Sequence, residues 1–358
     1  MSEDDLEKLN GVGPATADSL HENGFDSFRE IAVADASELA DKADVGESTA
    51  KKAIYSARDL ADVGGFETAF EVMKDRSDMH KISTMIPEVD DIMGGGLETS
   101  AITELYGEYG SGKSQVTHQM AVNVQVLPEH GGANGSCIFI DTEDSFRPLR
   151  VAEMAKGLDE EAMKGLIEDR DLDVTVEGVK NSEVSVTKDP QTEAEIFAQS
   201  ILDHVHVAKA FNSNHQILVT EKANDEAKEI EASGGLPVKL LVIDSLTSHF
   251  RAEYVGRGSL ADRQQKLNKH LHDIIKVVKT HNAAALITNQ VQSNPNSYFG
   301  DSTQAIGGNI LGHTSTFRVY LKQAKGNKRS WNLRNSPNLE EQAREILICD
   351  DGVKPDDY

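Results

Sequence analysis

The sequence is poor in cysteine, aromatic residues and long apolar runs, and each shortage excludes a class of protein. Only two of its 358 residues are Cys, and 5% are aromatic. Cys137 and Cys349 have no Cys or His at ligand spacing, which excludes a disulfide framework or zinc site and fits a reducing compartment. Apolar runs are strand-sized, so we expect no membrane-spanning helix. The N-terminus is acidic and unlike a secretory leader, so we expect a cytoplasmic protein without a membrane partner.

Basic charge is also scarce along nearly the whole chain. Lys and Arg total 36 against 60 Asp and Glu, which gives a formal net charge of −24 at pH 7. One interpretation is a soluble acidic protein that avoids polyanions. The acid is scattered over the whole length instead of lying in one tail, and this pattern favours a protein that stays hydrated in a very salty cytoplasm. We therefore predict a halophilic source.

The pattern of apolar and turn residues divides the chain into a small helical part and a larger α/β part. The predicted units are a helix-hairpin-helix DNA-binding domain at residues 1–62, a linker at 63–80 and a core at 81–358. Glycine hairpins at Leu9–Ala17 and Ala43–Ala50 indicate a tandem motif whose turn N–H groups face a phosphate. A protein-binding helical cap stays open as the alternative, because residues 1–80 hold 19 acidic and 8 basic side chains.

From Lys81 onward, short apolar strands alternate with helices. The expected strands are Ala101–Tyr106, Ser136–Asp141, Val205–Ala208, Leu240–Ile243 and Ala283–Thr288. Leu260–Lys279 has apolar side chains at helical spacing. This alternation predicts an α/β fold with a mostly parallel sheet covered by helices on both faces. Residues 157–194 are acidic and weakly patterned, so we expect a surface insertion there.

One motif indicates a specific chemistry. The stretch GEYGSGKS fits G-x-x-x-x-G-K-[ST] and lies between a predicted strand and a predicted helix. Its residues are Gly107, Glu108, Tyr109, Gly110, Ser111, Gly112, Lys113 and Ser114. The glycines let backbone N–H groups surround phosphates, Lys113 would neutralise the β- and γ-phosphates, and Ser114 would bind Mg²⁺. The sequence therefore predicts ATP and Mg²⁺ as cofactors.

Polar side chains follow three other predicted strands. Asp244 ends the strand Leu240–Ile243 in the manner of a Walker B acid, which holds Mg²⁺ through water. Glu143 follows another strand and is our candidate general base, and Gln290 follows a third and could sense the γ-phosphate. Each acid alone could equally be an N-cap or a surface charge. Parallel strands bring their carboxyl ends to one edge, so we expect these groups to meet the phosphate loop there.

Longer stretches are more specific than the phosphate loop. They are IDTEDSFRP at 140–148, AFNSNHQ at 210–216, DSLTSHFRAEYVGR at 244–257, TNQV at 288–291 and IGGNILGH at 306–313. On these residues the chain resembles the RecA/RadA family of strand-exchange recombinases, in the form found in salt-loving archaea. The resemblance implies a RecA-type P-loop ATPase core and a DNA-dependent ATPase that acts in DNA repair and homologous recombination. Such a protein forms an ATP-dependent helical filament on single-stranded DNA and pairs it with double-stranded DNA.

The resemblance also assigns DNA-contacting loops. The first covers roughly 251–258, where Arg251 and Arg257 would meet phosphates, and the second covers roughly 291–306, followed by Gly307 and Gly308. Arg251–Lys279 holds seven basic and three acidic residues, so basic charge gathers near these loops in an acidic chain. Solvated helix faces are the alternative explanation for that charge.

Subunit contacts are implied as well. Phe66 and Ala69 match the Phe-x-x-Ala polymerisation motif of the family, while an ordinary core Phe is the alternative. Arg150 matches an Arg that stacks on adenine, and Pro337 belongs to a cap segment that a neighbouring subunit lays over the nucleotide. Asn335 stands where the family has Asp, which puts in doubt a K⁺ ion near the γ-phosphate.

Other functions stay open at this point. A regulatory paralogue would bind a recombinase filament without exchanging strands, although such paralogues tend to lack the N-terminal domain or the second DNA loop. A ring ATPase or helicase explains the phosphate loop equally well but leaves the hairpin domain unexplained. Recombination mediators are further expected partners of a homo-oligomeric filament or ring.

The charge balance predicts that folding requires salt. With a net charge of −24, the acidic side chains repel one another. This repulsion extends over about 10 Å at 0.1 M salt, but over only about 3 Å at 1 M salt. We expect the purified chain to unfold as KCl is lowered from molar to about 0.1 M, measured by circular dichroism. Full stability in dilute buffer would contradict the halophilic interpretation.

Overall fold

The computed structural model describes residues 5–61, 68–77, 79–254, 256–293 and 303–358. The chain divides into two compact units, Met1–Asp78 and Met79–Tyr358, which we describe separately. The expected boundaries at residues 62 and 80 stay predictions. Among the helices that the structure describes, none combines the length and the apolar character that crossing a membrane requires.

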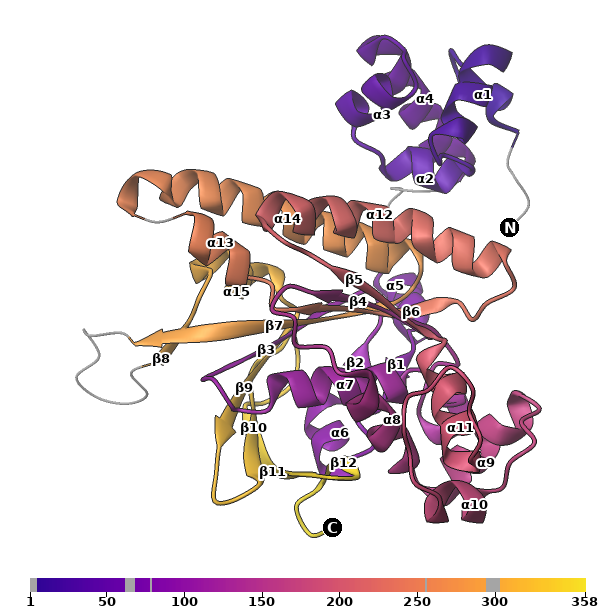
Figure 1. Cartoon of the computed structure of the whole chain (residues 1–358). Coiled ribbons are helices and arrows are strands. Elements are labelled where there is room, and N and C mark those ends of the chain that lie inside the picture. Colours follow the sequence, from indigo (N-terminus) through magenta and orange to yellow (C-terminus); the bar gives the residue numbers. More distant parts are fainter. Residues whose placement is uncertain (1–4, 62–67, 78, 255, 294–302) are drawn as a thin grey trace. The chain divides into compact units, whose positions relative to one another are not determined.

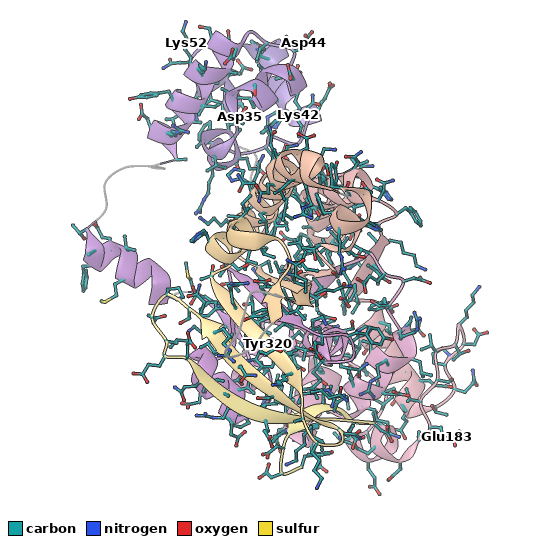
Figure 2. All side chains as sticks on the ribbon, turned by 90° about the vertical axis from the view of Figure 1, so that its left-hand side faces the viewer. Asp35, Lys42, Asp44, Lys52, Glu183 and Tyr320 are labelled. Carbon is teal, nitrogen blue, oxygen red and sulfur yellow. The ribbon has the colours of Figure 1, made fainter. Side chains whose placement is uncertain are left out.

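The first unit is a set of short helices around a small apolar core. The elements around this core are η1 (Leu6–Lys8), α1 (Pro14–Glu22), α2 (Phe28–Val33), α3 (Ala36–Lys42) and α4 (Glu47–Leu60). Helix α5 (Ala69–Ser77) belongs to the same unit, but its described residues contribute nothing to the core. Gly11, with φ of +88°, turns the chain before Pro14 opens α1, and Gly46 stands at the N-cap of α4. Charged side chains such as Asp44 and Lys52 are exposed on this unit (Figure 2).

A ten-stranded sheet forms the centre of the second unit (Figure 1). Its path is β12-β11-β10-β9-β3-β7-β6-β4-β5, with β8 beside β7. The strands are β3 (Ile102–Gly107), β4 (Ser136–Asp141), β5 (Val205–Lys209), β6 (Val238–Asp244), β7 (Ala284–Ser293), β8 (Thr303–Ala305), β9 (Phe317–Gln323), β10 (Lys328–Asn335), β11 (Gln342–Cys349) and β12 (Gly352–Pro355). The run from β9 to β5 is parallel, and β10, β11 and β12 extend it in antiparallel order. Strands β1 (Lys81–Ile82) and β2 (Leu97–Glu98) pair separately.

Helices cover both faces of this sheet (Figure 1). They are α6 (Pro87–Met93), α7 (Lys113–Asn123), η2 (Pro128–His130), α8 (Pro148–Lys156), α9 (Glu160–Asp169), α10 (Val176–Asn181), α11 (Glu193–Leu202), α12 (Ser213–Ala232), α13 (Ser248–Glu253), η3 (Arg257–Ser259), α14 (Leu260–Thr280) and α15 (Gly308–Thr314). Alternate residues of a strand point to opposite faces. In β6, Leu240 and Val242 pack in the core under α7, α8 and α11, while Leu241 and Ile243 pack in the core under α12 and α14.

Two parts of the sequence behave differently from expectation. The acidic stretch 157–194 is not wholly a surface insertion, because α9 and α10 bury Met163, Leu166 and Val179 in the main core. Its apolar residues recur at helical spacing between the acids, and that spacing decides the packing. The antiparallel strands β10 to β12 have no counterpart among the predicted strands.

Candidate nucleotide-binding site

The phosphate loop joins β3, which ends at Gly107, to α7, which begins at Lys113. A Cβ on Gly107 would lie 2.2 Å from the Leu321 carbonyl oxygen of the adjacent strand, so a larger residue does not fit. Gly110 and Gly112 have φ of +75° and +98°, a region that favours glycine. The backbone can therefore fold as tightly as a phosphate cradle requires.

Lys113 lies inside this loop. Its Nζ donates to the carbonyl oxygens of Gly107 and Glu108, at 3.0 and 2.9 Å. Burial lowers the pKa of Lys113, and the carboxylates of Asp244 and Glu143 oppose that shift. The ammonium group is thus held by the backbone of the phosphate loop itself, and a charged amine there is a strong donor for phosphate oxygens.

The other loop residues differ in exposure. Ser111 is buried and Ser114, in the first turn of α7, is half-buried. The side chains of Glu108 and Tyr109 are exposed, and Tyr109 is 102% exposed. Their side chains consequently take no part in enclosing the loop within this chain.

Two acids meet at the ends of adjacent parallel strands, where Asp141 of β4 is in register with Asp244 of β6. Asp244 is 3% exposed, and its Oδ1 accepts from Thr288 Oγ1 at 2.5 Å. Its Oδ2 accepts from Ser145 Oγ at 3.2 Å. These bonds orient the Asp244 carboxylate at the same edge as the phosphate loop.

Asp141 holds the loop that carries Glu143. Its carboxylate accepts from the backbone N–H groups of Glu143, Ser145 and Phe146, at 3.2, 3.0 and 3.0 Å. Asp141 was not among the predicted site residues. The signal in the sequence was an acid at the end of the predicted strand Ser136–Asp141, two residues before Glu143.

Glu143 is linked through Gln290 to a residue of the predicted DNA face. Gln290 Nε2 donates to Glu143 Oε1 at 3.0 Å, and Gln290 Oε1 accepts from Arg251 Nη1 at 3.3 Å. Gln290 is also in register with Gly107, because β7 and β3 are parallel neighbours. The structure therefore places the candidate base, the candidate phosphate sensor and a candidate DNA-binding arginine in one hydrogen-bonded chain.

Asn289 anchors both predicted DNA loops beside that chain. Its Nδ2 donates to the Ile306 carbonyl oxygen at 2.6 Å and to Glu104 Oε1 at 2.7 Å. Its Oδ1 accepts from Thr247 Oγ1 at 2.7 Å, immediately before α13. Fully buried Glu104 is held in turn by Arg318 Nε at 2.6 Å. One buried amide thus fixes the N-cap of α13, which leads into the predicted first loop, and the end of the predicted second loop.

The remaining DNA candidates lie next to these anchors. Arg251 is exposed on α13, and Gly307 and Gly308 form the N-terminal end of α15 with φ of +101° and +64°. The backbone of Arg257 belongs to η3, while its side chain lies outside the described part of the chain. Most of the second loop, residues 294–302, lies outside it as well.

Arg150 is fixed by hydrogen bonds around its guanidinium edge. Nε donates to Gln115 Oε1 at 2.8 Å and Nη1 to Glu153 Oε2 at 3.0 Å. Nη1 and Nη2 also donate to the carbonyl oxygens of Asp350 and Cys349. These bonds fix the plane of the guanidinium, whose side chain is 16% exposed, and the adenine contact stays a prediction.

Pro337 is remote from the phosphate loop of its own chain. Strand β10 begins beside that loop, where a Cβ on Gly112 would lie 3.5 Å from Arg329 Cγ. It ends at Asn335, six residues further on, which at about 3.3 Å per residue is roughly 20 Å away. The structure therefore does not bring Pro337 together with the other nucleotide candidates within one chain.

The predicted polymerisation residues are described only in part. Ala69 is exposed at the first position of α5. Phe66 lies outside the described residues.

Metal binding by this site involves few protein groups. Within the described ranges, no cluster of three or more His, Cys, Asp or Glu side chains could hold a metal ion. Mg²⁺ usually takes one or two protein ligands and fills its remaining positions with phosphate oxygens and water. The hydroxyl of Ser114 and the oriented carboxylate of Asp244 are ligands of that kind, so the residues present fit Mg²⁺ held together with a nucleotide.

Comparison with known proteins decides the family. The Rad51 family profile matches residues 75–171 and 191–356, and a SAM-like helix-hairpin-helix tandem profile matches residues 3–59. The chain belongs to the Rad51 family. This result confirms the predicted RecA-type core and the N-terminal helix-hairpin-helix domain. The break between 171 and 191 falls within the acidic stretch 157–194, after α9.

Relatives match this Rad51-family chain over almost all of its length. A "DNA repair and recombination protein RadA" of Haloquadratum walsbyi is 56% identical over 99% of the chain and 100% of that protein. Proteins with the same name from Haloferax volcanii and Halobacterium salinarum are 55% and 54% identical, again over 99% of this chain and 100% of theirs. All three sources are halophilic archaea, which agrees with the acidic composition.

The glycine requirement of the phosphate loop can be tested with two matched variants. Gly107→Ala places a Cβ against the backbone of β9 and should abolish ATP binding in calorimetry. Gly110→Ala meets nothing within 4 Å and bears only the left-handed strain of about 1–2 kcal/mol. ATP binding to Gly107→Ala as tight as to Gly110→Ala would show that this close approach does not shape the site.

Proposed function

We propose that the chain is a DNA-dependent ATPase that catalyses homologous pairing and strand exchange in DNA repair and recombination. The observation that carries this proposal is a chain of hydrogen bonds, Glu143–Gln290–Arg251. It joins the candidate base at the nucleotide site to an arginine of the predicted first DNA loop. A bound nucleotide that alters the Glu143–Gln290 contact also alters the restraint on Arg251. ATP and DNA would thereby be coupled through one side chain.

Several groups at the phosphate edge have separate roles in hydrolysis. Backbone N–H groups of the phosphate loop and the ammonium of Lys113 would bind the triphosphate. Glu143 would orient the attacking water and accept its proton, because its loop is held rigidly by Asp141. Ser114 and Asp244 would hold Mg²⁺, the latter through water, and the ion neutralises charge that develops on the phosphates.

Pro337 supports a nucleotide site shared between subunits. Its distance from its own phosphate loop, roughly 20 Å along β10, leaves it free to cover the nucleotide of a neighbour. Exposed Tyr109 and the guanidinium of Arg150 would then lie at that contact. Repetition of such a head-to-tail contact without closure gives a helical filament on DNA. Phe66 and Ala69 would supply a second contact between subunits. A K⁺ ion near the γ-phosphate and recombination mediators as partners are further proposals.

The regulatory paralogue is not supported as an alternative. Relatives named for DNA repair and recombination align with both units of this chain, including the hairpin domain and the segment around the second loop. Asn289, next to Gln290, bonds to Thr247 before the predicted first DNA loop and to Ile306 at the end of the predicted second. That arrangement suits a protein that binds DNA in response to a nucleotide.

Glu143→Gln separates binding from turnover. The amide can still pack beside Gln290 but cannot accept a proton, so ATP should bind normally while hydrolysis falls by about 100-fold or more. We expect persistent filaments on single-stranded DNA in molar KCl, seen by electron microscopy beside an ATPase assay and a strand-exchange assay of the unmodified chain. The exposed carboxylate of Glu129, changed in Glu129→Gln, serves as the control. Normal hydrolysis by Glu143→Gln would refute its role as base, and absence of strand exchange by the unmodified chain would refute the proposed function.

A further inference from the structure

His118 is a buried polar residue in the middle of the helix that carries the phosphate loop. It lies four residues after Ser114 in α7 and is 1% exposed. Helix α7 also buries Val116 and Met120 in the main apolar core, and polar Thr117 and Gln119 beside His118. The proposed roles of Lys113 and Ser114 leave His118 without a function.

The two ring nitrogens of His118 bond to two different elements. Nε2 lies 3.0 Å from the backbone nitrogen of Arg147, and Nδ1 contacts the carbonyl oxygen of Ser114. A backbone N–H can only donate, so Nε2 must be the acceptor. Nδ1 then carries the proton and donates to Ser114. Burial lowers the pKa of His118, which agrees with a neutral ring of this tautomer.

Aromatic packing holds the ring in that orientation. Phe146 stacks on His118 with centroids 5.2 Å apart and an interplanar angle of 16°. Phe139 of β4 meets the ring edge at 5.5 Å and also packs against Phe146 at 4.8 Å. The imidazole therefore has its plane fixed by stacking and its rotation fixed by two hydrogen bonds.

We infer that His118 is a positioning residue that ties the loop carrying Glu143 to the first turn of α7. Asp141 fixes the backbone of that loop from β4 at Glu143, Ser145 and Phe146. His118 fixes the next residue, Arg147, from α7. The general base and the turn that binds phosphate and metal would thereby keep a constant separation when the nucleotide changes.

This inference rests on the proposed function, because the separation matters only if Glu143 acts on a water at the γ-phosphate. Misplacing a catalytic group by about 1 Å can cost on the order of 100-fold in rate without altering binding. A loss of the His118 contact should therefore lower kcat while KM for ATP stays near its normal value.

Three substitutions separate the two hydrogen bonds. His118→Gln can place an acceptor oxygen where Nε2 lies and so keep the bond to Arg147. His118→Asn can place a donor where Nδ1 lies and so keep the bond to Ser114 but lose Arg147. His118→Phe keeps the stacking and loses both bonds. His281→Gln is a matched control, because His281 is 8% exposed and precedes β7 at the opposite edge of the sheet.

The first measurement is hydrogen exchange of the Arg147 amide in the nucleotide-free full-length protein. Exchange should be about tenfold faster in His118→Phe and His118→Asn, and close to normal in His118→Gln and His281→Gln. The second is ATP hydrolysis in molar KCl, where kcat should fall by at least about tenfold in His118→Phe and His118→Asn and recover in His118→Gln. If His118→Phe does not fold, the comparison of His118→Gln with His118→Asn decides.

Normal exchange and turnover in His118→Asn, or no advantage of His118→Gln over His118→Asn, would overturn the inference. A parallel loss of ATP binding and kcat would also overturn it, because the residue would then act on the phosphate loop alone. Failure of the proposed function has a different signature. In that case the exchange rates follow the expected order, while the unmodified chain itself does not hydrolyse ATP.

Discussion

The parallel register of β3, β7, β6 and β4 is the constraint on which the site depends. Because these strands run in one direction, Gly107, Gln290, Asp244 and Asp141 end at the same edge of the sheet. Their order matters as much as their direction. Strand β7 lies between the strand of the phosphate loop and the strand of Asp244, which places Gln290 beside both. A single side chain can therefore contact Glu143 and still reach Arg251.

Much of the site at this edge of the sheet could be predicted from the sequence, because its motifs are short and contiguous. The spacing of the phosphate loop and the acids after apolar strands are encoded in contiguous residues such as Lys113 and Asp244. The contacts of His118 and Asn289 could not be predicted in this way, because they join residues 29 and 42 positions apart in the chain. The buried helices α9 and α10 were also not predicted, because the many acids between their apolar residues obscured the helical spacing. Strand β10, which begins beside the phosphate loop, was not predicted, because antiparallel strands of mixed polarity resemble surface loops in sequence.

Charge and function make opposite demands on this chain. A net charge of −24 repels nucleic acid, yet basic side chains gather along α13 and α14 near the anchored loops. High salt weakens contacts between basic groups and DNA phosphates. A halophilic recombinase therefore benefits from a nucleotide-driven restraint on its DNA loops, because ordering a loop in advance adds affinity that salt does not screen. Gln290 and Asn289, adjacent at the end of β7, are placed to provide that restraint.

We propose that Gln290 transmits the state of the nucleotide to Arg251 and the predicted DNA loops. The most direct test is the affinity for single-stranded DNA in molar KCl, with and without a non-hydrolysable ATP analogue, in the unmodified chain and in Gln290→Ala. The analogue should tighten DNA binding of the unmodified chain by about tenfold or more and leave Gln290→Ala unchanged, while both bind the analogue equally. An equal gain in DNA affinity for Gln290→Ala would contradict the account.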